Sequence, residues 1–440
     1  MTTQLFSKLQ VYIQILLILL LISLLPLTPH VAVLHACKSS RPPFQHASTR
    51  NYSSFECSAG SQRFDIPIQE THRPQFPAAN DAFMRTCLLR DVCFIGGKLT
   101  YFVDDELEAA GPSSASSASA LALYTGYDSS PKWENKQLNF TFKHTPRPAH
   151  PPFAPTDRTY LLSELSYAEN FGHLLIDTII PAFAVADVFG LDMEHVQLLD
   201  TRSCETTATN SFVDMEGNLG DELCRRNLER WLVPLFTHPM LQSPIADSCY
   251  ERLIVGYALS FSLQGMFAHR ASAIRVMRHR MYDSLGVPPT FMGTSHKIAV
   301  LEKRVERAPT EYPGNGLCKD VRVWAERLRP MPEIICFVPA LLTVKQQLRH
   351  MVAASLVVAE HGSTTYLSLF QTVGSSLLIA VPDNKHAKEV QVLLYNTDVQ
   401  AWYFSFSQLQ KQGEGAVLLA LERAGRRLGL PPVFLSPRAL

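Results

Sequence analysis

The chain has 440 residues, 46% of them hydrophobic, and its 40 basic residues balance its 40 acidic ones. This length exceeds one ordinary hydrophobic core and suits two globular domains after a membrane segment and a stalk. A formal net charge of zero leaves no strong field for nucleic acid or an anionic membrane surface, so we expect no nucleic-acid partner.

The N-terminal region carries a membrane insertion signal. No charged residue occurs from Leu9 to Pro29, and this run exceeds the apolar core usual in a signal peptide. We therefore expect a cytoplasmic tail at residues 1–10 and an uncleaved signal-anchor at residues 11–29. A cleaved signal peptide is the alternative, because residues 34–36 loosely imitate a cleavage site.

Charge alone does not determine the orientation of the chain in the membrane. Only Lys8 precedes the apolar run, whereas Lys38 and Arg41 follow it, so the positive-inside rule alone does not place the tail in the cytoplasm. Asn51 and Asn139 each begin an N-glycosylation triplet, which is useful only in a luminal compartment. Unless both arose by chance, they favour a single-pass type II glycoprotein with a luminal head.

Nine cysteines are present, and none form a C-x-x-C pair, which argues against zinc-ribbon and thioredoxin sites. In a luminal compartment Cys87 could bridge to Cys93 and Cys204 to Cys224, although spacing does not determine connectivity. Cys336 lies in an apolar run and is expected to be a small buried core residue rather than a bridge partner.

The remaining chain alternates strands with helices. Residues 30–80 are rich in Ser, Pro, His and Arg and are expected to form a stalk. Residues 81–288 are expected to form a first domain, and a hinge at residues 286–289 separates it from a second domain at residues 289–440. Expected strands are 159–163, 196–199, 252–256, 297–301, 334–338, 356–359 and 377–381; expected helices are 168–189, 269–285, 321–328 and 344–354. This alternation predicts an α/β fold of two Rossmann-type, doubly wound domains that face one another, as in the GT-B architecture of sugar-transfer enzymes.

The strand that ends before His361 and Gly362 is the best indication of function. Ligands of open α/β sheets bind at the carboxyl ends of strands, and free N–H groups at a helix start favour a phosphate. Gly362 would let the backbone approach the ligand, and Ser363 and Thr364 add hydroxyl groups. The pattern predicts a diphosphate site; a capped helix with an incidental histidine is the alternative.

Three charged residues lie near the same strand ends. Glu360 is expected either to contact a ribose or sugar hydroxyl or to face solvent. Arg304 and Arg307 follow the strand at 297–301 and could reach phosphates, which a guanidinium group binds bidentately. Solvated surface is the alternative for both arginines.

A second constellation lies on the helix expected at 168–189. Asn170, His173 and Asp177 share one helical face at positions i, i+3 and i+7. His173 can abstract a proton near neutral pH, and Asp177 could orient its ring or raise its basicity. The alternative is a capped helix start with a hydrogen-bonded histidine and aspartate.

Together these motifs resemble glycosyltransferase family 61, which includes plant xylosyl- and arabinosyltransferases and the EGF-domain O-linked N-acetylglucosamine transferase. The resemblance covers roughly residues 85–405. It rests on Asn170 to His173 with Asp177, on Leu342 to Gln347, and on Val357 to Gly362. Cys87 and Cys93 are also similar to a cysteine pair early in the family domain.

The resemblance implies a Golgi or endoplasmic-reticulum enzyme that transfers a xylose, arabinose or N-acetylglucosamine type of sugar from a UDP sugar to a glycan or glycoprotein hydroxyl, with inversion. The second domain would hold the donor, and His173 or Asp177 would be the general base. Arg304 or Arg307 would neutralise the leaving group. No Asp-x-Asp pattern precedes a suitable site, so neither a metal nor another cofactor is expected.

Two other functions remain open. His173 and Asp177 also fit the H-x-x-x-D pattern of acyltransferases, although the glycine that normally follows the aspartate is missing. Residues 363–367 lack the second glycine and the asparagine common in family 61. This departure also fits an inactive family member that binds glycans.

Overall fold

A computed structural model describes residues 53–57, 86–96, 98–102, 140–143, 146, 153–163, 165, 168–200, 204, 220–242, 247–255, 271–291, 293–303, 312, 316–383 and 398–436. They all belong to the compact unit Ser48–Leu440. The predicted tail and anchor, Asn51, Asn139, Arg304 and Arg307 lie outside the described residues. Within those residues, no helix has both the length and the apolar character needed to cross a membrane.

The C-terminal sheet has five parallel strands in the order β11-β9-β12-β13-β14. The strands are β9 (Lys297–Leu301), β11 (Glu333–Phe337), β12 (Leu356–Glu360), β13 (Ser376–Val381) and β14 (Gln400–Ser405). The helices that cover them are α9 (Leu317–Ala325), α10 (Val344–Ala353) and α12 (Phe406–Leu428). This sheet confirms the α/β prediction for this part of the chain.

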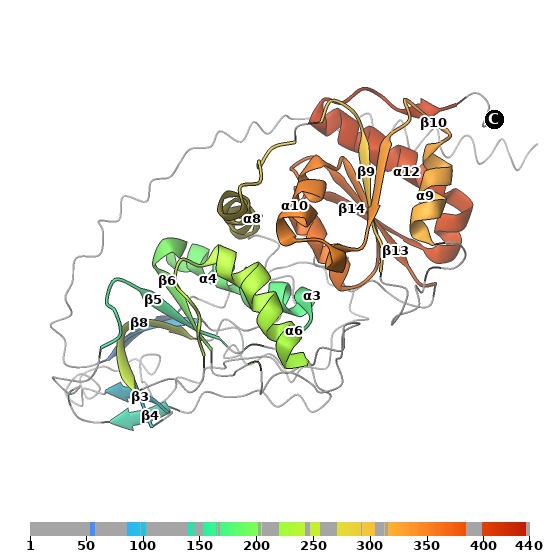
Figure 1. Cartoon of the computed structure of the whole chain (residues 1–440). Coiled ribbons are helices and arrows are strands. Elements are labelled where there is room, and N and C mark those ends of the chain that lie inside the picture. Colours follow the sequence, from blue (N-terminus) through green and yellow to red (C-terminus); the bar gives the residue numbers. More distant parts are fainter. Residues whose placement is uncertain are drawn as a thin grey trace, which may run out of the picture. The chain divides into compact units, whose positions relative to one another are not determined.

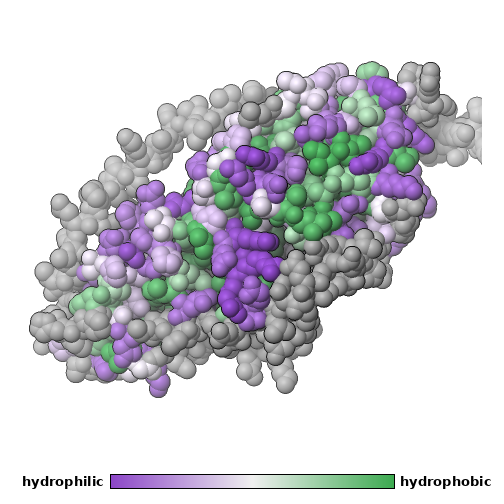
Figure 2. Space-filling view, in the orientation of Figure 1, coloured by the Kyte–Doolittle hydropathy of each residue, from purple (hydrophilic) through white to green (hydrophobic). Residues whose placement is uncertain are grey.

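Both faces of the C-terminal sheet are buried, which explains its nearly continuous apolar strands. Ile298 and Val300 of β9 pack toward α9 and α12, whereas Ala299 and Leu301 pack toward α10. Figure 1 shows α9 and α12 on one face and α10 on the other. On the side that Figure 2 shows, hydrophobic residues gather over these elements.

Local capping determines where α10 and α12 begin. Thr343 and Ser405 each form a capping box, with Gln346 at the start of α10 and with Gln408 at the start of α12. The helix predicted at 321–328 instead occupies Leu317–Ala325. Leu328 belongs to a short strand, β10 (Leu328–Arg329), which pairs with β15 (Phe434–Leu435).

The N-terminal sheet is mixed, with the order β4-β3-β2-β8-β5-β6-β7 and β1 beside β2. Its strands are β1 (Ser54–Cys57), β2 (Cys87–Ile95), β3 (Lys98–Phe102), β4 (Phe140–Lys143), β5 (Thr159–Ser163), β6 (Val196–Asp200), β7 (Leu241–Gln242) and β8 (Ser248–Val255). β1 lies within the range predicted as stalk. Strands β5 to β8 run parallel as expected, but β2 runs antiparallel to β1, β3 and β8. The short turn at Gly96, whose φ is +58°, cannot make the crossover that parallel neighbours require.

The helix predicted at 168–189 is present but changes its winding. It runs through α3 (Phe171–His173), the π-helical η4 (Leu174–Ile179) and α4 (Ile180–Phe189), and ends at Gly190 in the left-handed conformation. Pro181 has no N–H to donate to the carbonyl of Asp177 four residues earlier, and such a gap favours a wider turn. The other helices are α6 (Gly220–Asn227), the π-helical η6 (Leu228–Leu232), the 3₁₀-helical η7 (Val233–Leu235) and α8 (Ala271–Leu285).

Disulfides confirm one predicted pairing, correct another, and correct the prediction that Cys336 is unpaired. Cys204 is bonded to Cys224 as predicted. Cys93 is bonded to Cys249, directly opposite it on β8, so the Cys87–Cys93 pairing is wrong.

The prediction for Cys336 is also wrong, because Cys336 is bonded to Cys318 of α9. Cys336 packs on the face of the sheet that α9 covers. Strand periodicity alone could not show which helix covers that face.

Candidate functional site

The C-terminal sheet reverses its winding between β9 and β12. From β9 the chain crosses to β11 on one side, and from β11 it returns to β12 on the other. In open α/β sheets, ligands bind outside the carboxyl ends of the two strands at such a point. The predicted donor residues at 360–364 leave β12 at this edge, so the topology favours the predicted location.

The turn after β12 is tight and depends on glycine. The His361 N–H donates to the Ala380 carbonyl at 2.9 Å and so extends the pairing with β13. Gly362 then takes a φ of +118°. Residues that carry a Cβ rarely adopt this backbone conformation. The backbone turns there within one residue, as the sequence suggested.

The helix that follows, η9 (Ser363–Phe370), is a 3₁₀-helix rather than the expected α-helix. The Thr365 N–H bonds the Gly362 carbonyl at 3.0 Å. The hydroxyl of Thr365 bonds the same carbonyl at 2.5 Å, and that of Ser368 bonds the Thr365 carbonyl at 2.6 Å. Such local bonds compete with α-helical ones, so the start of η9 offers turn N–H groups rather than a full α-helical terminus.

The hydroxyls near the turn differ in what they contact. Ser363 and Thr365 both donate to protein oxygens. The Thr364 Oγ1 is buried and has no hydrogen-bond partner among the residues that the structure describes. A buried hydroxyl of this kind is suited to a bound polar ligand.

Glu360 is only 1% exposed, so of its two predicted alternatives the one in which it faces solvent is wrong. It belongs to a strand covered on both faces, and Lys303 Nζ lies 3.8 Å from its Oε2. The same Nζ lies 3.6 Å from the position that a Cβ on Gly362 would occupy. Lys303 therefore lies against both the strand end and the turn.

Sequence reasoning missed Lys303. It follows β9 by two residues, at the edge where ligands bind, and this position was the available signal. Arg304 and Arg307, which were predicted to bind phosphates, lie outside the described residues.

The second constellation forms a hydrogen-bonded pair. His173 Nδ1 lies 2.8 Å from Asp177 Oδ2, and the side chains are 38% and 12% exposed respectively. Burial alone lowers the pKa of His173, but the hydrogen bond and charge of Asp177, with the charge of Glu169, raise that pKa above its ordinary value. Burial raises the pKa of Asp177 more than His173 lowers it. The pair therefore holds a proton more readily than either side chain does in water.

Asn170 caps this helix and contacts the other motif. Its Oδ1 accepts the Gly172 N–H at 2.9 Å and the Ser363 hydroxyl at 2.6 Å. A Cβ on Gly172 would lie 3.0 Å from Ser363 and from Tyr366, so the backbone approaches η9 closely. The two motifs, 193 residues apart at Asn170 and Ser363, are in direct contact.

Aromatic side chains also link the helix start to η9. Phe171 lies 4.3 Å from Trp231 of η6 between ring centroids, and Trp231 lies 5.7 Å from Phe370 at the end of η9. Aromatic pairs at such distances add packing energy beyond area burial. The helix start and η9 therefore pack around a shared aromatic cluster.

Two further features bear on ligands. Within the part of the chain that the structure describes, no three His, Cys, Asp or Glu side chains gather as a metal site, and metal-independent transfer stays a prediction.

A cavity of about 230 Å³ lined by Lys297, Glu333 and Arg349 lies where β9 and β11 begin, at the opposite edge of the sheet from His361.

No protein-family model matches the chain, and a comparison with curated proteins finds no match. The resemblance to glycosyltransferase family 61 and the roles of the site residues therefore stay predictions from motifs and geometry.

Proposed function

We propose that the chain is an inverting glycosyltransferase with a GT-B-like arrangement of two domains, anchored in the Golgi or endoplasmic-reticulum membrane, that uses a UDP sugar. One observation carries the proposal. The glycine turn at a ligand-binding edge of a parallel sheet contacts the helix start that bears a histidine–aspartate pair. A diphosphate-binding turn beside a general base is what sugar transfer to a hydroxyl requires.

On the donor side, the turn at His361 and Gly362 would receive the diphosphate. Backbone N–H groups, the Thr364 hydroxyl and the Lys303 ammonium are the groups suited to its oxygens. Glu360 adds a negative charge, which the neighbouring Lys303 offsets. Arg304 and Arg307 would supply the remaining positive charge. Each well-placed donor to the leaving group contributes roughly 3–4 kcal/mol to lowering the barrier.

On the acceptor side, His173 is the better candidate for the base. Asp177 is more buried and already bonds Nδ1 of His173, which leaves Nε2 for the acceptor hydroxyl. The hydroxyl proton would pass to Nε2 while the oxygen attacks the anomeric carbon. The bond from that carbon to the diphosphate would break on the opposite face, and its electron pair would leave with UDP.

Titration of the purified chain with UDP and transfer assays with a panel of UDP sugars test the proposal. His361→Ala should weaken UDP binding and leave the His173–Asp177 pair intact. His173→Gln should leave UDP binding unchanged and lower transfer roughly 10²- to 10⁴-fold, the usual contribution of a general base. Equal effects of both substitutions on binding and transfer would contradict this division of roles.

Two outcomes would favour the other functions. Acyl-CoA donors belong in the same panel, and acyl transfer without UDP release would replace the proposal with an acyltransferase. Failure of the intact chain to bind UDP, together with binding to immobilised glycans, would favour a glycan-binding protein without transfer activity.

A further inference from the structure

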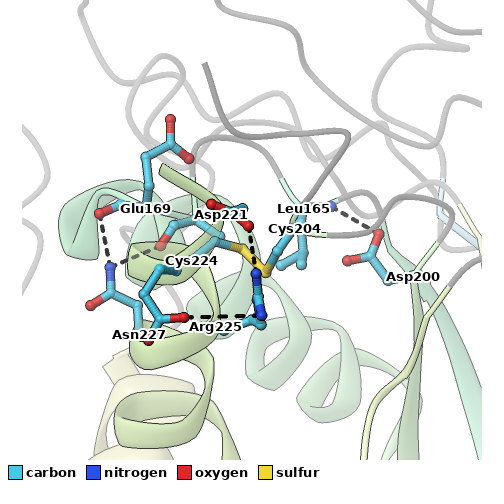
Figure 3. The surroundings of a disulfide bond; sticks show 10 residues. Leu165, Glu169, Asp200, Cys204, Asp221, Cys224, Arg225 and Asn227 are labelled. Atoms are coloured by element: carbon cyan, nitrogen blue, oxygen red, sulfur yellow. Dashed lines mark hydrogen bonds and ion pairs between the residues drawn. A yellow bond between two sulfur atoms is a disulfide. The ribbon is translucent and has the colours of Figure 1, made fainter. Parts of the chain in front are cut away.

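The segment that connects β5 to the helix start is held by side chains from other elements. The Leu165 N–H donates to Asp200 Oδ1 at 3.1 Å. Asn227 Nδ2 donates to the carbonyls of Ala168 and Glu169, each at 2.9 Å. Figure 3 shows both attachments, one on either side of the disulfide between Cys204 and Cys224. The segment that ends in Asn170 is thus fixed near both of its ends.

A covalent bond holds the element that carries Asn227. Cys224 lies one turn before Asn227 on α6, and its partner Cys204 follows Asp200 at the end of β6 by four residues. The outer side of α6 is polar, with Arg225 bonded to Asp221, and hydrophilic residues cover this region in Figure 2. On its other side, the buried Cys224 bonds α6 to Cys204, and the amide of Asn227 bonds α6 to the segment at Ala168 and Glu169.

Glu169, whose carbonyl Asn227 holds, also influences the His173–Asp177 pair. The Glu169 side chain is 6% exposed, and Figure 3 shows its carboxylate pointing away from Asn227, which holds only the backbone. That carboxylate acts on His173, one helical turn later, through its charge. Asn170, the next residue, caps the helix and receives the Ser363 hydroxyl.

We infer that Asn227 is a positioning residue for the His173–Asp177 pair, and that the Cys204–Cys224 disulfide keeps Asn227 in place. The inference rests on the proposed function for its catalytic meaning. The geometric claim, that Asn227 sets the surroundings of His173, stands apart from it.

The test compares Asn227→Ala with Gln197→Ala. Gln197 lies near the start of β6, at the opposite end from Asp200, and its amide also donates to a backbone carbonyl, that of Pro239, at 2.7 Å. Each substitution removes a side-chain amide that donates to a backbone carbonyl, Asn227 from helix α6 and Gln197 from strand β6. Unfolding by denaturant measures stability, calorimetry measures UDP affinity, transfer assays give kcat, and NMR titration of the His173 ring gives its pKa.

Both variants should lose stability, but only Asn227→Ala should alter the site. We expect kcat to fall roughly 10- to 100-fold, as for small misplacements of catalytic groups, with UDP affinity unchanged and the pKa of His173 lowered. Cys204→Ala combined with Cys224→Ala should act in the same direction. Adding Asn227→Ala to the double cysteine variant should lower kcat by less than the product of the separate effects. The effects of substitutions that act through the same contacts are not additive in free energy.

The inference is overturned if Asn227→Ala changes stability alone and leaves kcat and the pKa of His173 as in Gln197→Ala. If Asn227→Ala does not fold, Asn227→Asp, which keeps the size and removes the same donor, takes its place. If the intact chain neither binds UDP nor transfers sugar, the proposed function fails, while the pKa of His173 in the two variants still decides the geometric claim.

Discussion

The chain leaves β5 and β12 at the carboxyl ends of parallel strands, yet the two exits are built differently. After β12 the backbone turns at once, because Gly362 takes a φ of +118° and His361 still pairs with β13. After β5 a longer segment leads to Asn170, and Asp200 and Asn227 hold it. The conformation of the chain after β12 therefore depends on the backbone of the turn itself. The conformation after β5 depends on side chains that are distant in sequence.

The largest effect on the free energy of unfolding is expected for a substitution at the ion pair beside the end of η9. Arg278 of α8 is 2% exposed. It donates to the Gln371 carbonyl at 2.8 Å and to Asp398 Oδ2 at 2.6 Å, while Tyr282 donates to the Phe370 carbonyl. Asp398→Ala would leave a buried guanidinium without its carboxylate, so we expect a loss of about 3–5 kcal/mol in the free energy of unfolding.

Denaturant titration measures this loss. Glu333→Ala is the control, because Glu333 is 57% exposed in its pair with Lys297 and an exposed pair contributes about 0–1 kcal/mol. Equal losses in both variants would show that the buried pair does not anchor η9.

A smaller effect is expected at the turn itself. Gly362→Ala forces a side chain into a φ of +118°, which costs on the order of 1–3 kcal/mol, and it should also weaken UDP binding. Gly415→Ala is the matched control, since Gly415 lies within α12 and a Cβ there meets nothing within 4 Å. The control should be neutral or stabilise by about 0.4–1 kcal/mol. A Gly362→Ala protein as stable as the control would contradict the glycine requirement.

The contact between the two exits gives the next effect. Ser363→Ala removes the 2.6 Å bond to Asn170 Oδ1, while Asn170 keeps its bond to the Gly172 N–H. We expect a loss of about 1 kcal/mol in unfolding free energy. Ser272→Ala, which removes an exposed bond to Asp187, should cost less. If the order is reversed, the exits do not stabilise one another.

The smallest effect is a pH dependence. The pKa of His173 is raised above its ordinary value by Asp177 and Glu169 against the opposing effect of burial. A raised folded-state pKa stabilises the fold below the unfolded pKa of about 6.5, and this stabilisation is lost as pH rises through the folded value. His173→Gln should therefore flatten the stability curve in that window. Identical curves for both proteins would mean that the pair is not formed in solution.

Sequence patterns predicted the C-terminal sheet well because its strands are buried on both faces and read as apolar runs. They did not predict the 3₁₀ winding of η9, because the hydroxyls of Thr365 and Ser368 bond nearby carbonyls. Nor did they predict that Cys336 pairs with Cys318, since a strand's periodicity does not reveal the helix above it. The individual site residues came from local motifs. The contact of Asn170 with Ser363 depends on tertiary packing, which no local pattern encodes.

The bond between Cys93 and Cys249 closes a loop of 156 residues around β5, β6 and the His173–Asp177 pair. A protease that cuts once inside this loop leaves two polypeptides that still migrate together on a non-reducing gel and separate only after a thiol reductant is added. In an oxidising compartment, a nick there would not by itself release the segment that carries His173.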